Sequence, residues 1–361
     1  MNLTKIFTLL FTLSLVSCAT NYEEEKAVLM SKPENTDLVN SFDAKKAESE
    51  IFTENPKVEE KSPVKPEEKV ELNSKKKVSA KKETSLKKVT PGALAITAPA
   101  TTAIPADYPE EFKAYDDKAK GVWSKFSPVF YQGEQSIMAV TYLGVTAGHI
   151  TIHSKEITTL NSKPAYHFYA RFKSSDSYRY FYWLDDKLDS YVEKETFLPM
   201  KYSLVQREKK QNVDDLQLFD FKKMMTYNWY KRVKEGSNKD EKGEAKIPRY
   251  AQDSFSALQF VRGMPLNKGE TYEFPVITRG KFWILKVEVV GEETIEIMDQ
   301  DVKAIKIKAE TNFPGVLKKS GDILFWYSAD QERKFLKFQA KIKLGSLYGE
   351  LVEYKPGVKA Q

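Results

Sequence analysis

Two histidines four residues apart are the closest approach to a metal-binding pattern in this sequence. His149 and His153 have the spacing that places two zinc ligands on one face of a helix. Their segment, GHITIH (148–153), alternates in polarity as a strand does. In a strand the two side chains share a face but lie about 13 Å apart, too far to hold one ion without a bend. We therefore assign no metal site, and we expect the separate His167 to be a hydrogen-bonded structural histidine.

Acidic and hydroxyl side chains occur where they suit capping better than catalysis. Asp185, Asp186 and Asp189 cluster at an expected hairpin turn, where Asp side chains cap backbone amides. Calcium binding or general acid/base catalysis is the alternative for this cluster. Ser254 follows Asp253 at an expected helix start, without a G-x-S-x-G motif around it. No catalytic residue and no cofactor is assigned.

Aromatic residues provide the candidates for a binding surface. The segment from Tyr178 to Leu184 is expected to be a strand, with Tyr180 and Tyr182 on one face and Trp183 on the other. Trp229 lies in a similar aromatic run. Aromatic faces stack on sugar rings or line slots for acyl chains, and they fill cores equally well. We take these residues as candidate ligand-binding residues: Tyr180, Tyr182, Trp183 and Trp229.

Strands must position these side chains, because most of the chain beyond residue 107 alternates with period two. The segments IKIKA (305–309) and LKFQAKIKL (336–344) place apolar residues on one face and polar or cationic residues on the other. Similar runs recur at short spacing, separated by Gly, Asn, Asp and Pro. The sequence predicts an all-β or strongly β-rich fold. We expect a large antiparallel curved sheet or open barrel with one or two short helices.

Two helices and one loop interrupt this pattern. Residues 108–120 predict a short leading helix. Asp253 is the expected N-cap of a second helix, which ends at Gly263 and would lie across one face of the sheet. The segment KEGSNKDEKGEAK (234–246) predicts a mobile hairpin loop. The β-rich domain is expected to span residues 107–361.

The N-terminus has the features of an export signal. The apolar run from Ile6 to Val16 is shorter than the about 20 residues that span a bilayer as a helix, so residues 1–17 are interpreted as a signal peptide. The segment LVSC (15–18) resembles the lipobox of bacterial lipoproteins, in which the thiol is acylated and the chain is cut before the Cys. Cys18 is the only cysteine and has no disulfide partner. The resemblance implies a lipid anchor in the bacterial cell envelope, and Ala19 in place of Asp favours the outer membrane.

Residues 18–106 are predicted to be a disordered stalk and linker. The segment is rich in Glu, Lys, Ser, Thr and Pro, so it cannot bury enough apolar surface to offset the entropy of ordering. Residues 23–60 are mainly acidic, whereas residues 61–88 are mainly basic. The lysine clusters have the charge to bind anionic glycan or lipid phosphate, and nucleic acid is not expected as a partner of an exported chain. A solvated spacer is the simpler interpretation.

Four segments resemble the bacterial domain-of-unknown-function family 3108. They are YLGVTAGHITI (142–152), WLDDKLDSYVEKETFLPMKY (183–202), DSFSALQFVRGMPLNKGETYEFPV (253–276) and FWYSADQERKFLKFQAKIKLGSLYGELVEY (325–354). The resemblance implies an envelope-located β-rich domain without established chemistry. It also implies a likeness in shape to periplasmic lipoprotein carriers and sensor domains, whose curved sheet holds acyl chains under helices. It assigns no functional residues.

Three functions remain open. The leading hypothesis is a non-catalytic envelope lipoprotein whose β-domain binds a hydrophobic or glycan ligand, or a protein partner, in envelope assembly or maintenance. The second is a structural tether in which the lysine-rich stalk holds cell wall or lipid phosphate. The third is a hydrolase of envelope polymers, for which the groups to test are His149, His167, Asp185 and Asp253. An enclosed apolar cavity beside residues 178–183 would favour the first, and a solid core there the second.

Overall fold

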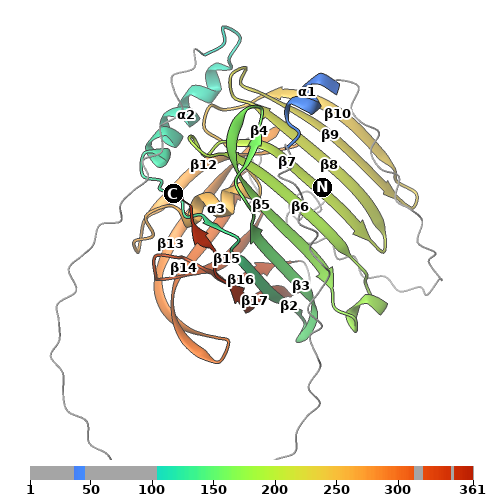
Figure 1. Cartoon of the computed structure of the whole chain (residues 1–361), viewed down its shortest axis with the longest axis vertical. Helices are drawn as coiled ribbons and strands as arrows, with labels where there is room; N and C mark the ends of the chain where they lie inside the picture. The colour runs from blue at the N-terminus through green and yellow to red at the C-terminus, as the bar shows by residue number, and fades with distance from the viewer. Residues whose placement is uncertain (1–35, 45–103, 313–319, 343–344, 361) are drawn as a thin grey trace, which may run out of the picture. The chain divides into compact units, whose positions relative to one another are not determined.

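The computed structural model describes residues 36–44, 104–312, 320–342 and 345–360. Most of the regular structure in these residues is β-strand, which confirms the predicted β-rich fold (Figure 1). One 16-stranded sheet contains nearly all of the strands, and its two edge strands, β10 and β11, do not pair with each other. The sheet is therefore open. Cys18, the signal peptide and most of the predicted stalk lie outside the described residues.

Neighbouring strands are antiparallel apart from one parallel pair, β11 with β12, and most neighbours are consecutive in the chain. The exception in the middle of the sheet is β2 with β17, which come from opposite ends of the domain. From one edge to the middle the strands are β10 (Lys239–Lys246), β9 (Met225–Lys234), β8 (Gln211–Asp220), β7 (Pro199–Glu208), β6 (Asp185–Glu193), β5 (Lys163–Ser174), β3 (Val145–Ser154) and β2 (Gln135–Tyr142). The order continues through β17 (Ser346–Lys355), β16 (Phe335–Lys341), β15 (Ser320–Ser328), β14 (Gln300–Asn312), β13 (Lys281–Ile297), β12 (Thr271–Thr278) and β11 (Gln252–Asp253). The short β4 (Thr158–Leu160) pairs with β5, and β1 (Tyr131–Gln132) pairs with β18 (Val358–Lys359).

Side chains bridge the sheet across its gap. In the turn between β12 and β13, Arg279 Nε donates to Asp215 Oδ2 of β8 at 2.7 Å. The backbone N–H of Arg279 donates to Gln217 Oε1 at 2.8 Å, and its guanidinium lies 3.7 Å from the ring centre of Tyr230. The pKa of Asp215 is raised by burial and held back by the guanidinium of Arg279. These contacts join the two halves of the sheet without a strand ladder.

Two α-helices pack together against one face of this sheet. They are α2 (Glu110–Trp123), which corresponds to the predicted leading helix, and α3 (Ser256–Arg262), which corresponds to the predicted internal helix. The rings of Trp123 and Phe126 lie 4.2 and 4.3 Å from the ring of Phe260. Because these large side chains come from both helical segments, they form an aromatic core between α2, α3 and the sheet.

The opposite face of the sheet has its own hydrophobic cluster. The short helix α1 (Thr36–Ser41) is followed by Phe42, which is only 4% exposed and packs with Leu218 and Trp229. Lys201, which pairs with Leu218 in register, donates from Nζ to the carbonyl oxygen of Phe42 at 3.2 Å. Residues 36–44 lie within the predicted disordered stalk of residues 18–106. Instead the buried Phe42 supplies the apolar contact that orders them.

Three local predictions were wrong. Residues 178–184 do not form a strand: Tyr178–Tyr180 is a 3₁₀ turn, η3. The run SSDS (174–177) ends β5, and Ser175 Oγ accepts the N–H of Tyr178 at 3.3 Å. The Asp cluster is not a hairpin turn, because Asp185 begins β6. The loop expected over residues 234–246 contains the edge strand β10, whose charged, exposed side chains hide the alternation of a strand.

No helix within the described ranges is both long enough and apolar enough to cross a membrane.

Candidate functional site

Helix α3 lies over the sheet and is fixed at its N-terminal end by Asp253. Asp253 Oδ1 accepts the N–H groups of Phe255 and Ser256, each at 2.8 Å, although the N-cap position of α3 is Phe255 and not the predicted Asp253. Its other oxygen, Oδ2, accepts the hydroxyl of Ser190 on β6 at 2.6 Å. Burial raises the pKa of Asp253, and these hydrogen bonds oppose that rise. The carboxyl group therefore joins the start of the helix to the middle of the sheet.

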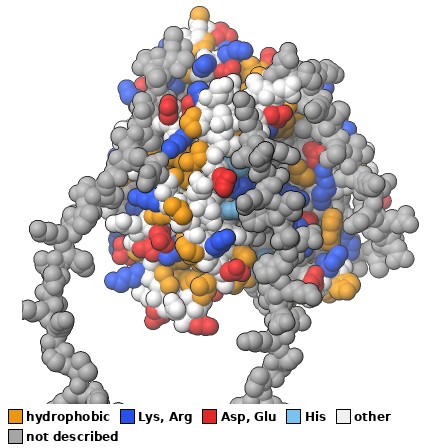
Figure 2. All heavy atoms as spheres, viewed as in Figure 1, with side chains coloured by type: hydrophobic (Ala, Val, Ile, Leu, Met, Phe, Trp, Pro, Cys, Tyr) orange, Lys and Arg blue, Asp and Glu red, His pale blue; other side chains and the backbone are white. Residues whose placement is uncertain are grey.

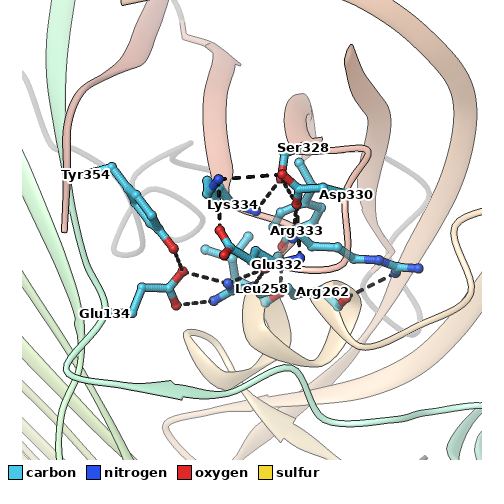
Figure 3. A network of polar contacts seen from close by, with 10 residues as sticks. Glu134, Leu258, Arg262, Ser328, Asp330, Glu332, Arg333, Lys334 and Tyr354 are labelled. Carbon is cyan, nitrogen blue, oxygen red and sulfur yellow. Dashed lines mark hydrogen bonds and ion pairs between the residues drawn. The ribbon is translucent and has the colours of Figure 1, made fainter. Parts of the chain in front are cut away.

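A buried ion pair fixes the other end of the helix (Figure 3). Arg262 binds Glu134 through two parallel contacts, Nη1 to Oε2 at 2.6 Å and Nη2 to Oε1 at 2.7 Å. Both side chains are 6% exposed. Tyr354 Oη donates to Glu134 at 2.9 Å, and Arg262 Nε donates to the carbonyl oxygen of Glu332 at 3.2 Å. Such paired, fully hydrogen-bonded charges hold a fixed geometry.

Between these two anchors, α3 and the sheet enclose an apolar cavity of about 130 Å³. Fifteen of its sixteen lining residues are apolar, and Ser254 is the exception. The helix and the residues before it contribute Ser254, Phe255, Ala257, Leu258 and Val261. The sheet contributes Ile150, Ile152, Ala170, Phe172, Leu188, Leu285, Ala309, Ile323, Phe325, Phe335 and Phe338. The alternation of these strands directs the side chains to the helix side.

The cavity meets solvent on one side and a polar pocket on the other. Phe172, Leu285 and Ile323 are only half-buried. Phe172 lies near the end of β5, and Leu285 and Ile323 lie near the starts of β13 and β15. At the other side Leu258 and Phe335 also line a small pocket of about 20 Å³. That pocket contains Glu134 and Arg262. The site can therefore exclude water from an apolar group and place a polar group near an ion pair.

A sequence model of the family described as "Protein of unknown function (DUF3108)" matches residues 138–352. The chain belongs to the DUF3108 family. All residues that line the cavity fall within the matched range.

Solved structures from two bacteria are similar to this DUF3108 chain at 10% sequence identity. One is a beta-barrel-like protein of domain of unknown function DUF1849 from Brucella abortus, with a TM-score of 0.43, covering 63% of this chain and 99% of that chain. The other is a "putative lipoprotein" from Parabacteroides distasonis, with a TM-score of 0.29, covering 63% of this chain and 98% of that chain. None of the curated proteins compared matches the sequence.

The histidines of the DUF3108 chain lie away from the cavity. His149 is exposed on β3, and His153 is half-buried there, where burial lowers its pKa to about 4. His167 Nε2 hydrogen-bonds Asp189 Oδ1 at 2.6 Å, and its ring stacks on Tyr191 with centroids 4.2 Å apart. The prediction of a hydrogen-bonded structural histidine is confirmed. Within the described residues, no group of three or more His, Cys, Asp or Glu side chains could hold a metal ion.

The structure disperses the predicted aromatic candidates. Tyr180 is 82% exposed, whereas Tyr182 is buried and donates from Oη to Glu208 Oε2 at 2.7 Å. Trp183 is half-buried, and Trp229 lies under Phe42 on the face opposite α3. None of the four lines the cavity. That they bind a ligand stays a prediction, because nothing in the structure tests it.

The three clustered aspartates have three separate partners. Asp185 accepts both Nε and Nη2 of Arg171 at 2.7 Å, and Asp189 bonds His167. Asp186 is buried and accepts the N–H of Arg207 at 2.9 Å. The cavity instead draws one or two apolar residues from each of seven strands, and alternation within a strand does not show which strands come together.

Proposed function

We propose that this chain is an exported lipoprotein, acylated at Cys18, whose DUF3108 domain binds an acyl chain beneath α3 without catalysis, in envelope assembly or maintenance. The observation that carries the proposal is the composition of the cavity wall, which is apolar except for Ser254. The lipobox-like segment at residues 15–18 supports the anchor, and Ala19 favours the outer membrane.

The size of the cavity suits part of a lipid. An apolar cavity of roughly 150 Å³ stays dry and binds benzene, so about 130 Å³ admits a ring or the last few methylenes of a chain. Each buried methylene contributes about 0.8 kcal/mol. The half-buried Phe172, Leu285 and Ile323 extend the apolar surface beyond the enclosed part. A longer chain would thus be held partly inside and partly along the mouth.

The same wall disfavours the alternatives for this site. A glycan needs several hydrogen-bonding groups, and the wall offers only Ser254. Hydrolysis needs a titratable group or a metal ion beside the substrate, and none of the lining residues titrates. The tether hypothesis concerns lysine clusters outside the described residues, so it is independent of the cavity.

Binding of cis-parinaric acid, a fluorescent fatty acid, tests the proposal. Ala257 is buried in α3 against the cavity, so Ala257→Leu should fill the space. We expect its affinity to fall by about tenfold or more while thermal stability is kept, since filling a void adds packing. Ala245→Leu on β10, away from the cavity, is the matched control and should bind as the wild type does. Equal affinity of Ala257→Leu and wild type would remove the cavity from the proposal.

A further inference from the structure

Four of the five most exposed large apolar side chains among the described residues lie on or beside two loops. Leu143 (70% exposed) lies in the turn between β2 and β3, and Val145 (54%) is the first residue of β3. Tyr180 (82%) and Phe181 (72%) lie at η3, between β5 and β6. We call these four residues the apolar rim. Single exposed apolar residues are common, but a group of four needs an explanation.

Backbone contacts hold the two loops side by side. The N–H of Ser175 donates to the carbonyl oxygen of Ala147 at 3.0 Å, and Ser175 Oγ donates to that of Thr146 at 2.9 Å. Both acceptors lie at the start of β3, directly after Val145. The two parts of the rim therefore lie on adjoining segments at one end of the sheet.

The turn that carries Leu143 places a bulky residue in the left-handed backbone region. Leu143 has φ 49° and Gly144 has φ 80°, the two positive values of a type I′ turn. Asn, Asp or Gly suits the first position, because a bulky side chain in the left-handed region loses about 1 kcal/mol. Leu in this conformation, directed into water, is unfavourable on both counts. Eight other non-Gly residues among the described ones also have positive φ, Met298 included, so the grouping of four exposed apolar side chains distinguishes the rim.

The polar surroundings of the rim are mainly cationic. Lys173 and Arg179 are exposed, and Lys209 donates from Nζ to the carbonyl oxygens of Tyr180 and Phe181 at 3.4 and 3.3 Å. Asp176 is the exposed carboxylate of the same loop, and it pairs with Arg179 at 3.9 Å. Figure 2 shows Lys and Arg interspersed with Asp and Glu over the visible face. The apolar side chains of the rim suit the upper acyl region of a bilayer, and the cations near them suit its anionic headgroups.

We propose that the apolar rim rests in the headgroup and upper acyl region of a lipid bilayer. Phe172, in the mouth of the cavity, lies two residues before the end of β5, so the rim would bring this mouth toward the membrane. The proposal rests on the acylation of Cys18 for proximity: Thr36 of α1 follows eighteen residues later, which limits its distance from the anchor to about 60 Å.

A site-specific probe on the intact lipoprotein tests this contact. Cys18 is the only cysteine and is blocked when acylated, so a cysteine introduced by Leu143→Cys is a unique site for the fluorophore NBD. The labelled chain is reconstituted in vesicles of phosphatidylethanolamine and phosphatidylglycerol. The matched control is Met298→Cys, because Met298 is 49% exposed at φ 53° in the turn between β13 and β14, at the opposite strand ends.

We expect NBD at position 143 to be blue-shifted and quenched by bromine-labelled acyl chains about fivefold more than NBD at position 298. The quenching should persist in roughly 0.5 M salt, which screens the lysine clusters of residues 61–88. Adding Tyr180→Ser and Phe181→Ser should reduce it severalfold, and Ala257→Leu should leave it unchanged.

Equal, solvent-like emission at positions 143 and 298 would overturn the proposal. A blue shift at position 143 that depends on protein concentration and needs no vesicles would also overturn it, because the rim would then contact a second copy. If wild-type protein bound no fatty acid but NBD at position 143 were still quenched, only the proposed acyl-chain binding in the cavity would be contradicted. If NBD labelled Cys18 itself, only the proposed acylation of Cys18 would be contradicted.

Discussion

At the residue scale, the most unusual chemistry is a pair of buried carboxyl groups, one at the start of β6 and one at the end of β7. Asp186 is 6% exposed and Glu208 is 3% exposed. Gln206 Nε2 donates to both, at 3.1 Å in each case, and Tyr182 Oη donates to Glu208. Burial, followed by the negative charge of Glu208, raises the pKa of Asp186 to about 8. Two carboxyl groups this close hold one proton between them near neutral pH.

This pair should make the stability of the domain fall as the pH rises. The folded pKa of Asp186 lies above its ordinary value of 3.8, so between about pH 4 and pH 8 the folded chain keeps a proton that the unfolded chain has lost. The free energy of unfolding then decreases with pH by at most about 1.4 kcal/mol per unit. Asp186→Asn should flatten this slope in urea denaturation at pH 5 and pH 8. Asp185→Asn, at the half-exposed neighbour, should keep the wild-type slope, and a slope kept by Asp186→Asn would contradict the assignment.

The ion pair at the end of α3 predicts a large effect from one side chain. Arg262→Ala leaves Glu134 buried without its cation, which costs about 3–5 kcal/mol in the free energy of unfolding. Arg262→Lys should recover only part of this, because one ammonium cannot make both parallel contacts. Lys337→Ala, which breaks the more exposed pair with Glu350, should cost less than about 1 kcal/mol and serves as the control. Denaturant titration measures the free energy of unfolding of the three variants. An equal loss for Arg262→Ala and Lys337→Ala would contradict the larger contribution expected from the buried pair.

At the scale of elements, helix α1 and Phe42 hold the N-terminal segment on the face of the sheet opposite α3. Phe42→Ala removes a buried aromatic side chain. If the segment stayed docked, the substitution would lower the free energy of unfolding by about 3 kcal/mol or more. Because the segment is short, we expect it to detach instead, leaving the sheet folded. Hydrogen exchange should then rise in residues 36–44 and around Leu218 and Trp229, with no change around α3. Val39→Ala, at a half-buried position of α1, should give a smaller effect.

The elements also show what alternation can predict. The strands were predictable wherever one face meets the core and the other meets water, as in Phe335–Lys341. The pattern fails in β10, because both faces are exposed. Alternation wrongly predicted a strand over residues 178–184, because the segment is rich in aromatic residues. A hydrogen bond from the N–H of Tyr178 to Ser175 Oγ stabilises a turn there instead. The cavity could not be predicted, since its wall depends on strand order and on which residues α3 leaves uncovered.

At the scale of the whole chain, the docking of α1 on the domain limits how far the domain can lie from the lipid anchor. If residues 36–44 stay on the sheet, only the seventeen residues between Cys18 and Thr36 separate the lipid from the domain. The longer segment at residues 45–103 then does not set this distance. The cavity mouth and the apolar rim lie at the same end of the sheet, and the connection to the anchor is short. These features together fit a protein that exchanges an acyl chain with the membrane. Each depends on a different set of residues, so each can fail separately.

Acylation of Cys18 is the prediction on which the location of the whole molecule depends. Wild-type cells should incorporate labelled palmitate into the chain and carry it in the membrane fraction. Cys18→Ser should abolish the label and leave an uncut precursor, because the acylated thiol is the substrate for cleavage before residue 18. Ser17→Ala keeps a small residue in the lipobox and should behave as the wild type does. Stable anchoring needs more than one acyl chain, so a singly acylated product would be released from membranes slowly. Wild-type chain that takes up no palmitate, yet is exported, would show that Cys18 is an ordinary thiol beside a cleaved signal.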